Sequence, residues 1–145
     1  MADATHAEYG AAPNEALITP AACAVPEPGA PRLNGKQRVR LTPDSLAARV
    51  YGASETFAEF HCSNELNRRY QPLFERSELH VSGVGDEGEA RVVELAGAAF
   101  HVATLYLPQL AAAQGEPDPL IDAFVQAAAG VPPVGQSAEN FNQSD

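Results

Sequence analysis

Three observations predict a mixed domain of the α/β or α+β class. Short segments in which apolar and polar residues alternate predict β-strands, and a strong turn signal joins two of them. Residues 100–107 are nearly apolar on both faces, which is typical of a strand buried in the middle of a sheet. Residues 118–130 carry the start, apolar face and end signals of an α-helix. These patterns predict a fold class but no function.

The first third of the chain predicts little regular structure. Residues 17–20 are compatible with a short strand that ends at its proline. Residues 23–35 contain three prolines and two glycines and predict a loop. Residues 38–41 alternate in polarity and predict a strand.

The middle of the chain predicts a short helix followed by irregular structure. Residues 46–51 are expected to form a short helical turn, with Asp44-Ser45 supplying a capping residue in front and Gly52 behind. Apolar residues recur at helical spacing in residues 66–73, but Pro72 argues against a regular helix there.

A β-hairpin is predicted next, followed by the buried strand. Residues 79–83 and 90–95 are the two expected strands, and Gly85-Asp86-Glu87-Gly88 is the turn. His101 falls in the buried strand and is expected to be a core histidine rather than a ligand.

The closing helix is the clearest element of the sequence. Asp118 can cap it, Pro119 fits its first position, and Gly130 lies just past its end. The apolar face expected to pack on the sheet consists of Leu120, Ile121, Phe124, Val125 and Ala128.

Composition excludes several classes of partner. The 145 residues carry 9 Lys and Arg against 19 Asp and Glu, a formal charge of −10. Such an acidic chain is not expected to bind nucleic acid or an anionic membrane surface. Two cysteines, Cys23 and Cys62, are too few for a disulfide framework. With no secretory signal at the N-terminus, a cytoplasmic location is the plain expectation.

Four stretches of the chain carry a family resemblance. They are residues 38–52 (RVRLTPDSLAARVYG), residues 65–83 (ELN, then Tyr70, then LHVSG), residues 93–109 (VEL, then FHVATLYLPQ) and residues 118–125 (DPLIDAFV). In this order and spacing they resemble the C-terminal class I glutamine amidotransferase domain of CTP synthase. The resemblance is closest to stand-alone proteins related to that region, and it covers roughly residues 33–128.

The resemblance implies an α/β fold, the C-terminal half of a flavodoxin-like amidotransferase domain with a β-hairpin and a closing helix. Residues 33–130 would be this partial domain. Residues 1–32 would be a poorly ordered lead-in or the remnant of a missing upstream half, and residues 131–145 a disordered tail. The first strands of a doubly wound parallel sheet would then be absent. A fragment or misassigned start is favoured over a natively short protein, because the incomplete sheet would expose an edge.

The catalytic residues implied by the resemblance are missing. The family's histidine and glutamate lie in a His-Pro-Glu tripeptide, and Leu107-Pro108-Gln109 occupies that place. Leu107 cannot act as a general base, and Gln109 cannot stabilise an imidazolium by charge. The nucleophilic cysteine of the family lies on a glycine-rich turn that this chain lacks. No catalytic residue is therefore expected to be intact.

A degenerate pocket is expected near these positions, formed by His61, Cys62, Asn64 and Glu65. The family's Arg- and His-rich run falls on residues 59–64, which contain no arginine to bind a substrate carboxylate. Adjacent residues of an extended segment point to opposite faces, so His61 and Cys62 are not expected to meet as base and nucleophile. No metal ligand set and no cofactor are expected.

Three functions remain open at the level of sequence. The chain is either a non-catalytic domain that binds a glutamine-like small molecule or takes part in assembly, or a part of an active CTP synthase-related enzyme of pyrimidine biosynthesis. The third alternative is a cysteine hydrolase whose nucleophile lies in a missing upstream half. Whether the chain is an enzyme is thus undecided, and its partner is expected to be a second copy or that missing half.

Overall fold

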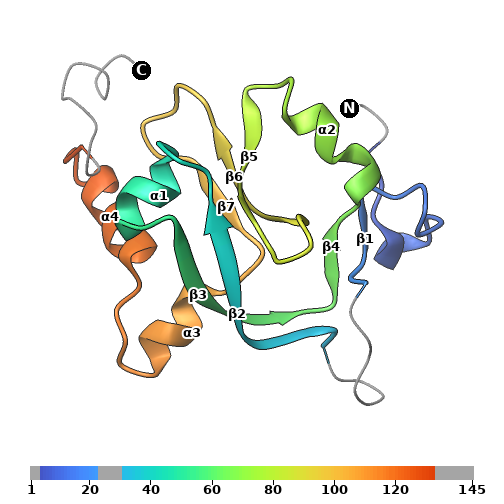
Figure 1. The fold of residues 1–145 in the computed structure, drawn as a ribbon, viewed down its shortest axis with the longest axis horizontal. Helices are drawn as coiled ribbons and strands as arrows, with labels where there is room; N and C mark the ends of the chain where they lie inside the picture. The colour runs from blue at the N-terminus through green and yellow to red at the C-terminus, as the bar shows by residue number, and fades with distance from the viewer. Residues whose placement is uncertain (1–3, 23–30, 133–145) are drawn as a thin grey trace.

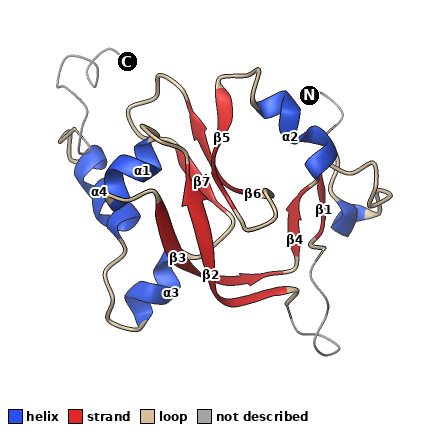
Figure 2. Ribbon diagram, viewed as in Figure 1, coloured by secondary structure: helices blue, strands red, loops and turns tan. Residues whose placement is uncertain are grey.

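A computed structural model describes residues 4–22 and 31–132. A curled five-stranded sheet, in the order β3-β2-β5-β6-β7, forms its centre, and a two-stranded sheet of β1 and β4 lies beside it (Figures 1 and 2). The strands are β1 (Ile18–Pro20), β2 (Leu33–Leu41), β3 (Glu55–Cys62), β4 (Asn64–Leu66), β5 (Leu79–Val84), β6 (Ala90–Leu95) and β7 (Val102–Thr104). The strand pairs of both sheets are antiparallel, and parallel pairing within the described residues is limited to an isolated bridge between His6 and Ile18.

The long pair of β2 and β3 starts earlier than the sequence pattern predicts. β2 begins at Leu33, which lies opposite Cys62, and the pairing continues to Arg40 opposite Glu55. The loop expected over residues 23–35 is therefore wrong for its last three residues, and residues 23–30 lie outside the described part. Cross-strand pairing with β3 overrides the local turn signal of Gly35, whose φ of 76° a glycine adopts without strain.

The predicted hairpin is confirmed as β5 and β6. Its register shifts around Gly83, where a bulge bends the ladder. A side chain at Gly83 would come within 2.7 Å of Val92, so the two strands approach too closely there for any residue but glycine.

The expected central strand is wrong in length and in place. β7 contains three residues rather than eight, and it lies at the edge of the sheet, paired with β6. Ala103 and His101 are exposed, so His101 is not the core histidine that the apolar run predicted. An apolar run of this length cannot distinguish a central strand from an edge strand that other segments partly cover.

Both predicted helices form with the expected caps. α1 (Leu46–Tyr51) is capped by the Ser45 hydroxyl, which accepts from the Ala48 N–H at 3.1 Å. α4 (Pro119–Ala128) is capped by Asp118, which accepts from the Leu120 N–H at 2.9 Å. Two further helices, α2 (Gln71–Phe74) and α3 (Pro108–Ala113), and a 3-10 turn at Arg68–Tyr70 complete the middle and the end of the fold.

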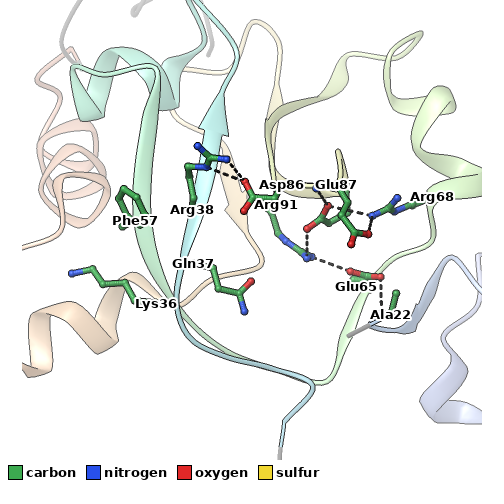
Figure 3. A pocket seen from close by; sticks show the side chains of 11 residues that line it. Ala22, Lys36, Gln37, Arg38, Phe57, Glu65, Arg68, Asp86, Glu87 and Arg91 are labelled. Atoms are coloured by element: carbon green, nitrogen blue, oxygen red, sulfur yellow. Dashed lines mark hydrogen bonds and ion pairs between the residues drawn. The ribbon is translucent and has the colours of Figure 1, made fainter. Parts of the chain in front are cut away.

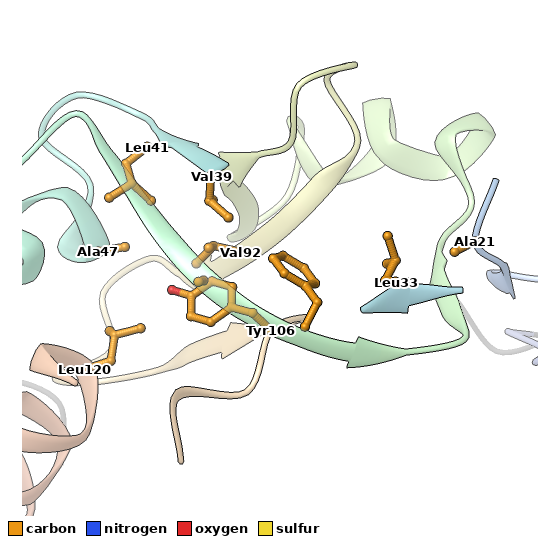
Figure 4. Close-up of a cluster of buried hydrophobic side chains, with 10 residues drawn as sticks. Ala21, Leu33, Val39, Leu41, Ala47, Val92, Tyr106 and Leu120 are labelled. Atoms are coloured by element: carbon orange, nitrogen blue, oxygen red, sulfur yellow. The ribbon is translucent and has the colours of Figure 1, made fainter. Parts of the chain in front are cut away.

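The apolar face of α4 is only partly buried, in contrast to the expectation. Leu120 and Ala123 are buried, whereas Phe124 and Val125 are each 58% exposed. The core lies inside the curled sheet (Figure 4). Its largest buried side chains are Phe60 and Tyr106, whose rings meet edge to face at 5.9 Å.

Residues before β2 also contribute to the fold. β1 pairs with β4, and Ala16 and Ala21 are buried. The proposed domain boundary at residue 32 remains a prediction, and the predicted disordered tail lies outside the described residues from 133 onward. Among the helices of the described part, none has the length and apolar character needed to cross a bilayer.

Candidate functional site

One cavity, with a volume of about 630 Å³, is lined mainly by charged side chains (Figure 3). β2 and β3 supply one wall, and the turn between β5 and β6 supplies another. Its lining residues are Ala22, Lys36, Gln37, Arg38, Phe57, Glu65, Arg68, Asp86, Glu87, Glu89 and Arg91. Four cations and four carboxylates therefore face one space, and their formal charges balance.

A buried arginine forms the base of this cavity. The Arg91 side chain is 2% exposed and lies between two carboxylates, Glu65 at 3.0 Å and Glu89 at 2.7 Å. Its guanidinium also stacks over the Phe60 ring at 5.5 Å. Burial of a guanidinium is tolerated here because both of its charged partners are buried with it.

A second arginine extends the network toward solvent. Arg68 lies 3.3 Å from Glu89 and 3.1 Å from Glu87. The backbone N–H of Glu87 also donates to Glu89, at 3.0 Å. Glu89 therefore joins the buried and the exposed halves of the network.

The mouth of the cavity is more exposed. Arg38 donates two hydrogen bonds to Asp86, at 2.9 and 2.7 Å, and this contact raises the pKa of Arg38. Phe57 lies opposite Arg38 on β3 and is 59% exposed. The side chain of Gln37 has no hydrogen-bond partner within residues 4–22 and 31–132. A ligand at this mouth would meet cations, carboxylates, an amide and one aromatic ring.

The degenerate tripeptide lies elsewhere, at the start of α3. The Leu107 N–H donates to the Glu59 carbonyl at 2.9 Å, which holds this segment against β3. Pro108 is the first residue of α3, and Gln109 is exposed on its first turn. Leu107 and Gln109 line none of the cavities that we describe for residues 4–22 and 31–132.

The four residues of the predicted pocket do not share one cavity. The Cys62 thiol donates to the Leu105 carbonyl at 2.9 Å, whereas His61 lies 3.4 Å from Asn34. Asn64 pairs with Pro20 in the two-stranded sheet. Only Glu65 lines a described cavity, where it bonds the Ala22 N–H at 3.1 Å in addition to Arg91.

Sequence reasoning missed the charged residues that gather around Glu65. Arg91 sits in an otherwise apolar run, Ala90 to Val93, and this run predicts only a strand. A lone arginine in such a run is the one signal that indicates a buried ion pair, because an unpaired charge would not be tolerated there. Its partners Glu65 and Glu89 lie 26 and 2 residues away, and only the fold brings the first of them close.

The chain is similar in sequence to CTP synthases. It is 33% identical to the CTP synthase of Picosynechococcus sp. over 106 residues, which are 72% of this chain and 19% of that protein. It is also 33% identical to the CTP synthase of Rubrobacter xylanophilus over 97 residues, 66% of this chain and 18% of that protein. The chain thus spans less than a fifth of the length of these curated relatives. No protein-family model matches it.

Structural comparison agrees with the sequence. The fold matches a solved glutaminase domain of Trypanosoma brucei CTPS with bound acivicin, at a TM-score of 0.76 and 21% identity. The match covers 90% of this chain and 52% of the solved domain, as expected for part of a flavodoxin-like amidotransferase fold. In sequence the chain is similar to part of CTP synthases, and its fold matches part of a CTPS glutaminase domain.

Proposed function

We propose that this chain is a glutaminase-like domain that binds a small zwitterionic amino acid, such as glutamine, without hydrolysing it. One observation carries the proposal: Leu107, an aliphatic residue, stands at the start of α3 where the resemblance implies a catalytic histidine. A leucine can neither take a proton from a thiol nor deliver one to a leaving amine.

The contacts of Cys62 and His61 support the absence of hydrolysis. A cysteine nucleophile needs a base within hydrogen-bond reach, about 3 Å, so that the thiolate forms. The Cys62 thiol instead donates to a backbone carbonyl, and the His61 ring lies near Asn34. The carbonyl of Leu105 is not a general base that could take the thiol proton.

The charged cavity supports a binding role. An amino-acid zwitterion carries an ammonium and a carboxylate, and it therefore needs carboxylates and cations in one site. Glu87, which is 78% exposed, and Arg38, which is 42% exposed, offer both kinds of group at the mouth. The exposed ring of Phe57 can contact the aliphatic part of such a ligand.

Calorimetric titration with glutamine tests the binding role. We expect measurable binding that weakens about tenfold in Arg38→Gln and in Glu87→Gln, since each loses one charged contact of about 1.4 kcal/mol. Arg76→Gln is the matched control, because Arg76 is exposed and does not line the cavity. Equal affinity in all four proteins, or no heat at millimolar glutamine, would contradict the proposed site.

A second function is favoured by one specific observation. The chain covers only 52% of the glutaminase domain that it resembles. In this second function, the chain is one part of an active CTP synthase-related enzyme, or of a cysteine hydrolase. The nucleophile then lies in the part of the glutaminase domain that this chain does not cover. The intact mass of the protein from its own cells distinguishes the two. A mass near 15.3 kDa favours the non-hydrolysing domain, and a clearly larger mass favours the longer enzyme.

A further inference from the structure

A second polar cavity lies beside the start of α1 and shares no lining residue with the charged cavity of the candidate site. Its volume is about 200 Å³, and its titratable lining residues are Asp44, Arg49, His80, Glu94 and His101. They come from α1 and the turn before it, from β5, and from β6 and the loop that follows β6. We call this space the histidine cavity, because two of the four histidines of the chain line it.

The imidazole rings of this cavity make no hydrogen bond or ion pair within residues 4–22 and 31–132. His80 lies opposite Glu94 in the ladder of β5 and β6, so the two side chains are on one face of the sheet. His101 is exposed, and its backbone carbonyl accepts from the Leu95 N–H at 3.1 Å. A protonated imidazole has two N–H donors. Both rings can therefore donate to a ligand in the cavity.

Arg49 adds a permanent positive charge to the same space. Its Nη1 donates to the Asp44 carbonyl, and its Nε is buried without a hydrogen-bond partner in the described part of the chain. A buried N–H without a partner costs free energy, and an acceptor bound in the cavity would remove that cost. Carboxylate and phosphate oxygens are the acceptors that form the strongest hydrogen bonds with a guanidinium. The unpartnered Nε therefore indicates an anionic ligand.

The two carboxylates of the cavity set the pH at which an anion can bind. Both oxygens of Glu94 accept N–H groups at the first turn of α1, at 2.8 Å each, so these N–H groups are not available to a ligand. Asp44 is exposed on the turn before α1. With neutral imidazoles, the titratable groups of the cavity have an excess of one negative charge, and with both imidazoles protonated an excess of one positive charge. An ordinary imidazole takes up its proton near pH 6.5, so anion binding is expected on the acidic side of neutrality.

We propose that the histidine cavity binds a small tetrahedral oxyanion, either inorganic phosphate or the phosphate group of an ester, when His80 and His101 are protonated. Donors from three elements line the cavity: α1, β5 and the loop before β7. A tetrahedral ion has enough oxygen atoms to accept from all three, whereas a planar carboxylate has two. The space also suffices for such an ion, since a water molecule occupies about 30 Å³ of liquid. This site is independent of glutamine binding in the charged cavity.

NMR of the histidine rings tests the site. Sulfate is the probe, because its charge stays constant between pH 5.5 and 8, whereas that of phosphate changes. At pH 5.5 we expect the ring signals of His80 and His101 to shift and saturate as sulfate is added. The ring signals of His6 and His61, which do not line the cavity, are expected to stay in place. At pH 8 we expect the affinity for sulfate to be at least about tenfold lower, because each lost proton removes a charge-assisted contact.

Four variants locate the binding site. His101→Gln and Arg49→Lys are each expected to weaken sulfate binding at pH 5.5 about tenfold, since the first loses a positive charge and the second loses the Nε donor. His61→Gln is the matched histidine control, because His61 is exposed and lies outside the cavity. Arg38→Gln, in the charged cavity, is expected to bind sulfate as the wild type does. Circular dichroism verifies that all four variants are folded.

Inorganic phosphate and methyl phosphate, compared at pH 5.5, identify the source of the ion. Equal affinity for the two assigns the cavity to a phosphate ester, and binding of inorganic phosphate alone assigns it to the free ion. The proposal is overturned if sulfate at tens of millimolar leaves the ring signals of His80 and His101 unchanged, or shifts that of His61 equally. Equal sulfate affinity at pH 5.5 and pH 8, or in His101→Gln and the wild type, also overturns it.

Discussion

At the scale of single residues, the ion-pair network at the base of the charged cavity depends most on Arg91. It is the most buried charged side chain of the network and bonds both Glu65 and Glu89. The exposed Arg68 shares one of these partners, Glu89, but lies 46% open to solvent. Water replaces the lost contacts of an exposed arginine, whereas it cannot reach two buried carboxylates.

We therefore predict that Arg91→Met lowers the free energy of unfolding by about 3–5 kcal/mol, because it removes the buried cation from Glu65 and leaves Glu89 with only the more exposed Arg68. Arg68→Met is the matched comparison and is expected to cost less than about 1 kcal/mol. Urea denaturation of the three proteins measures both values. Equal effects of the two substitutions would show that Arg91 is not the residue that sustains the network.

At the scale of elements, α1 depends on a carboxylate from a distant strand. Both Glu94 oxygens accept backbone N–H groups at its first turn, Leu46 and Ala47, each at 2.8 Å. The negative charge of Glu94 also interacts favourably with the positive end of the helix dipole. Ser45 supplies the local cap at 3.1 Å.

We predict that Glu94→Gln costs more stability than Ser45→Ala. The amide of glutamine would turn a donor toward one of the two helix N–H groups, at a cost of about 2–3 kcal/mol. Loss of the Ser45 cap is expected to cost about 1 kcal/mol. Thermal unfolding followed by circular dichroism ranks the two variants, and the reverse order would contradict the role given to Glu94.

The elements also show which features a sequence can predict. The hairpin, α1 and α4 carry their own turn and cap residues, and their predictions are confirmed. The place of β7 at the sheet edge depends on strand order, which no local pattern encodes. The pairing of Arg91 with Glu65 likewise depends on β4 and β6 coming together. The pocket predicted from His61, Cys62, Asn64 and Glu65 therefore does not include the charged neighbours of Glu65.

At the scale of the whole molecule, the buried Tyr106 and the partly buried Tyr51 join distant parts of the chain. The Tyr51 hydroxyl of α1 lies 3.1 Å from the Tyr106 hydroxyl and donates to Asp118, the cap of α4. Burial is the main cause that raises the pKa of both phenols above the ordinary value of 10.0. The core thus holds both tyrosines in their neutral form.

The sign of the resulting pH dependence follows from these raised pKa values. Below pH ~10 both phenols are protonated in the folded and the unfolded chain, and their contribution to stability is fully present. Above it the unfolded chain loses phenol protons first, so stability falls as pH rises. We predict that this alkaline loss is smaller in Tyr51→Phe than in wild type, as measured by urea denaturation between pH 8 and 11. An identical loss in both proteins would contradict this assignment.

Binding of glutamine without hydrolysis is tested most directly by NMR of glutamine labelled with ¹⁵N at its side-chain amide, mixed with the purified chain. We predict that the amide signal broadens or shifts as the chain is added, and that no labelled ammonium forms over many hours. Formation of labelled ammonium that stops in Cys62→Ser would contradict the account, because it would make Cys62 a working nucleophile despite Leu107.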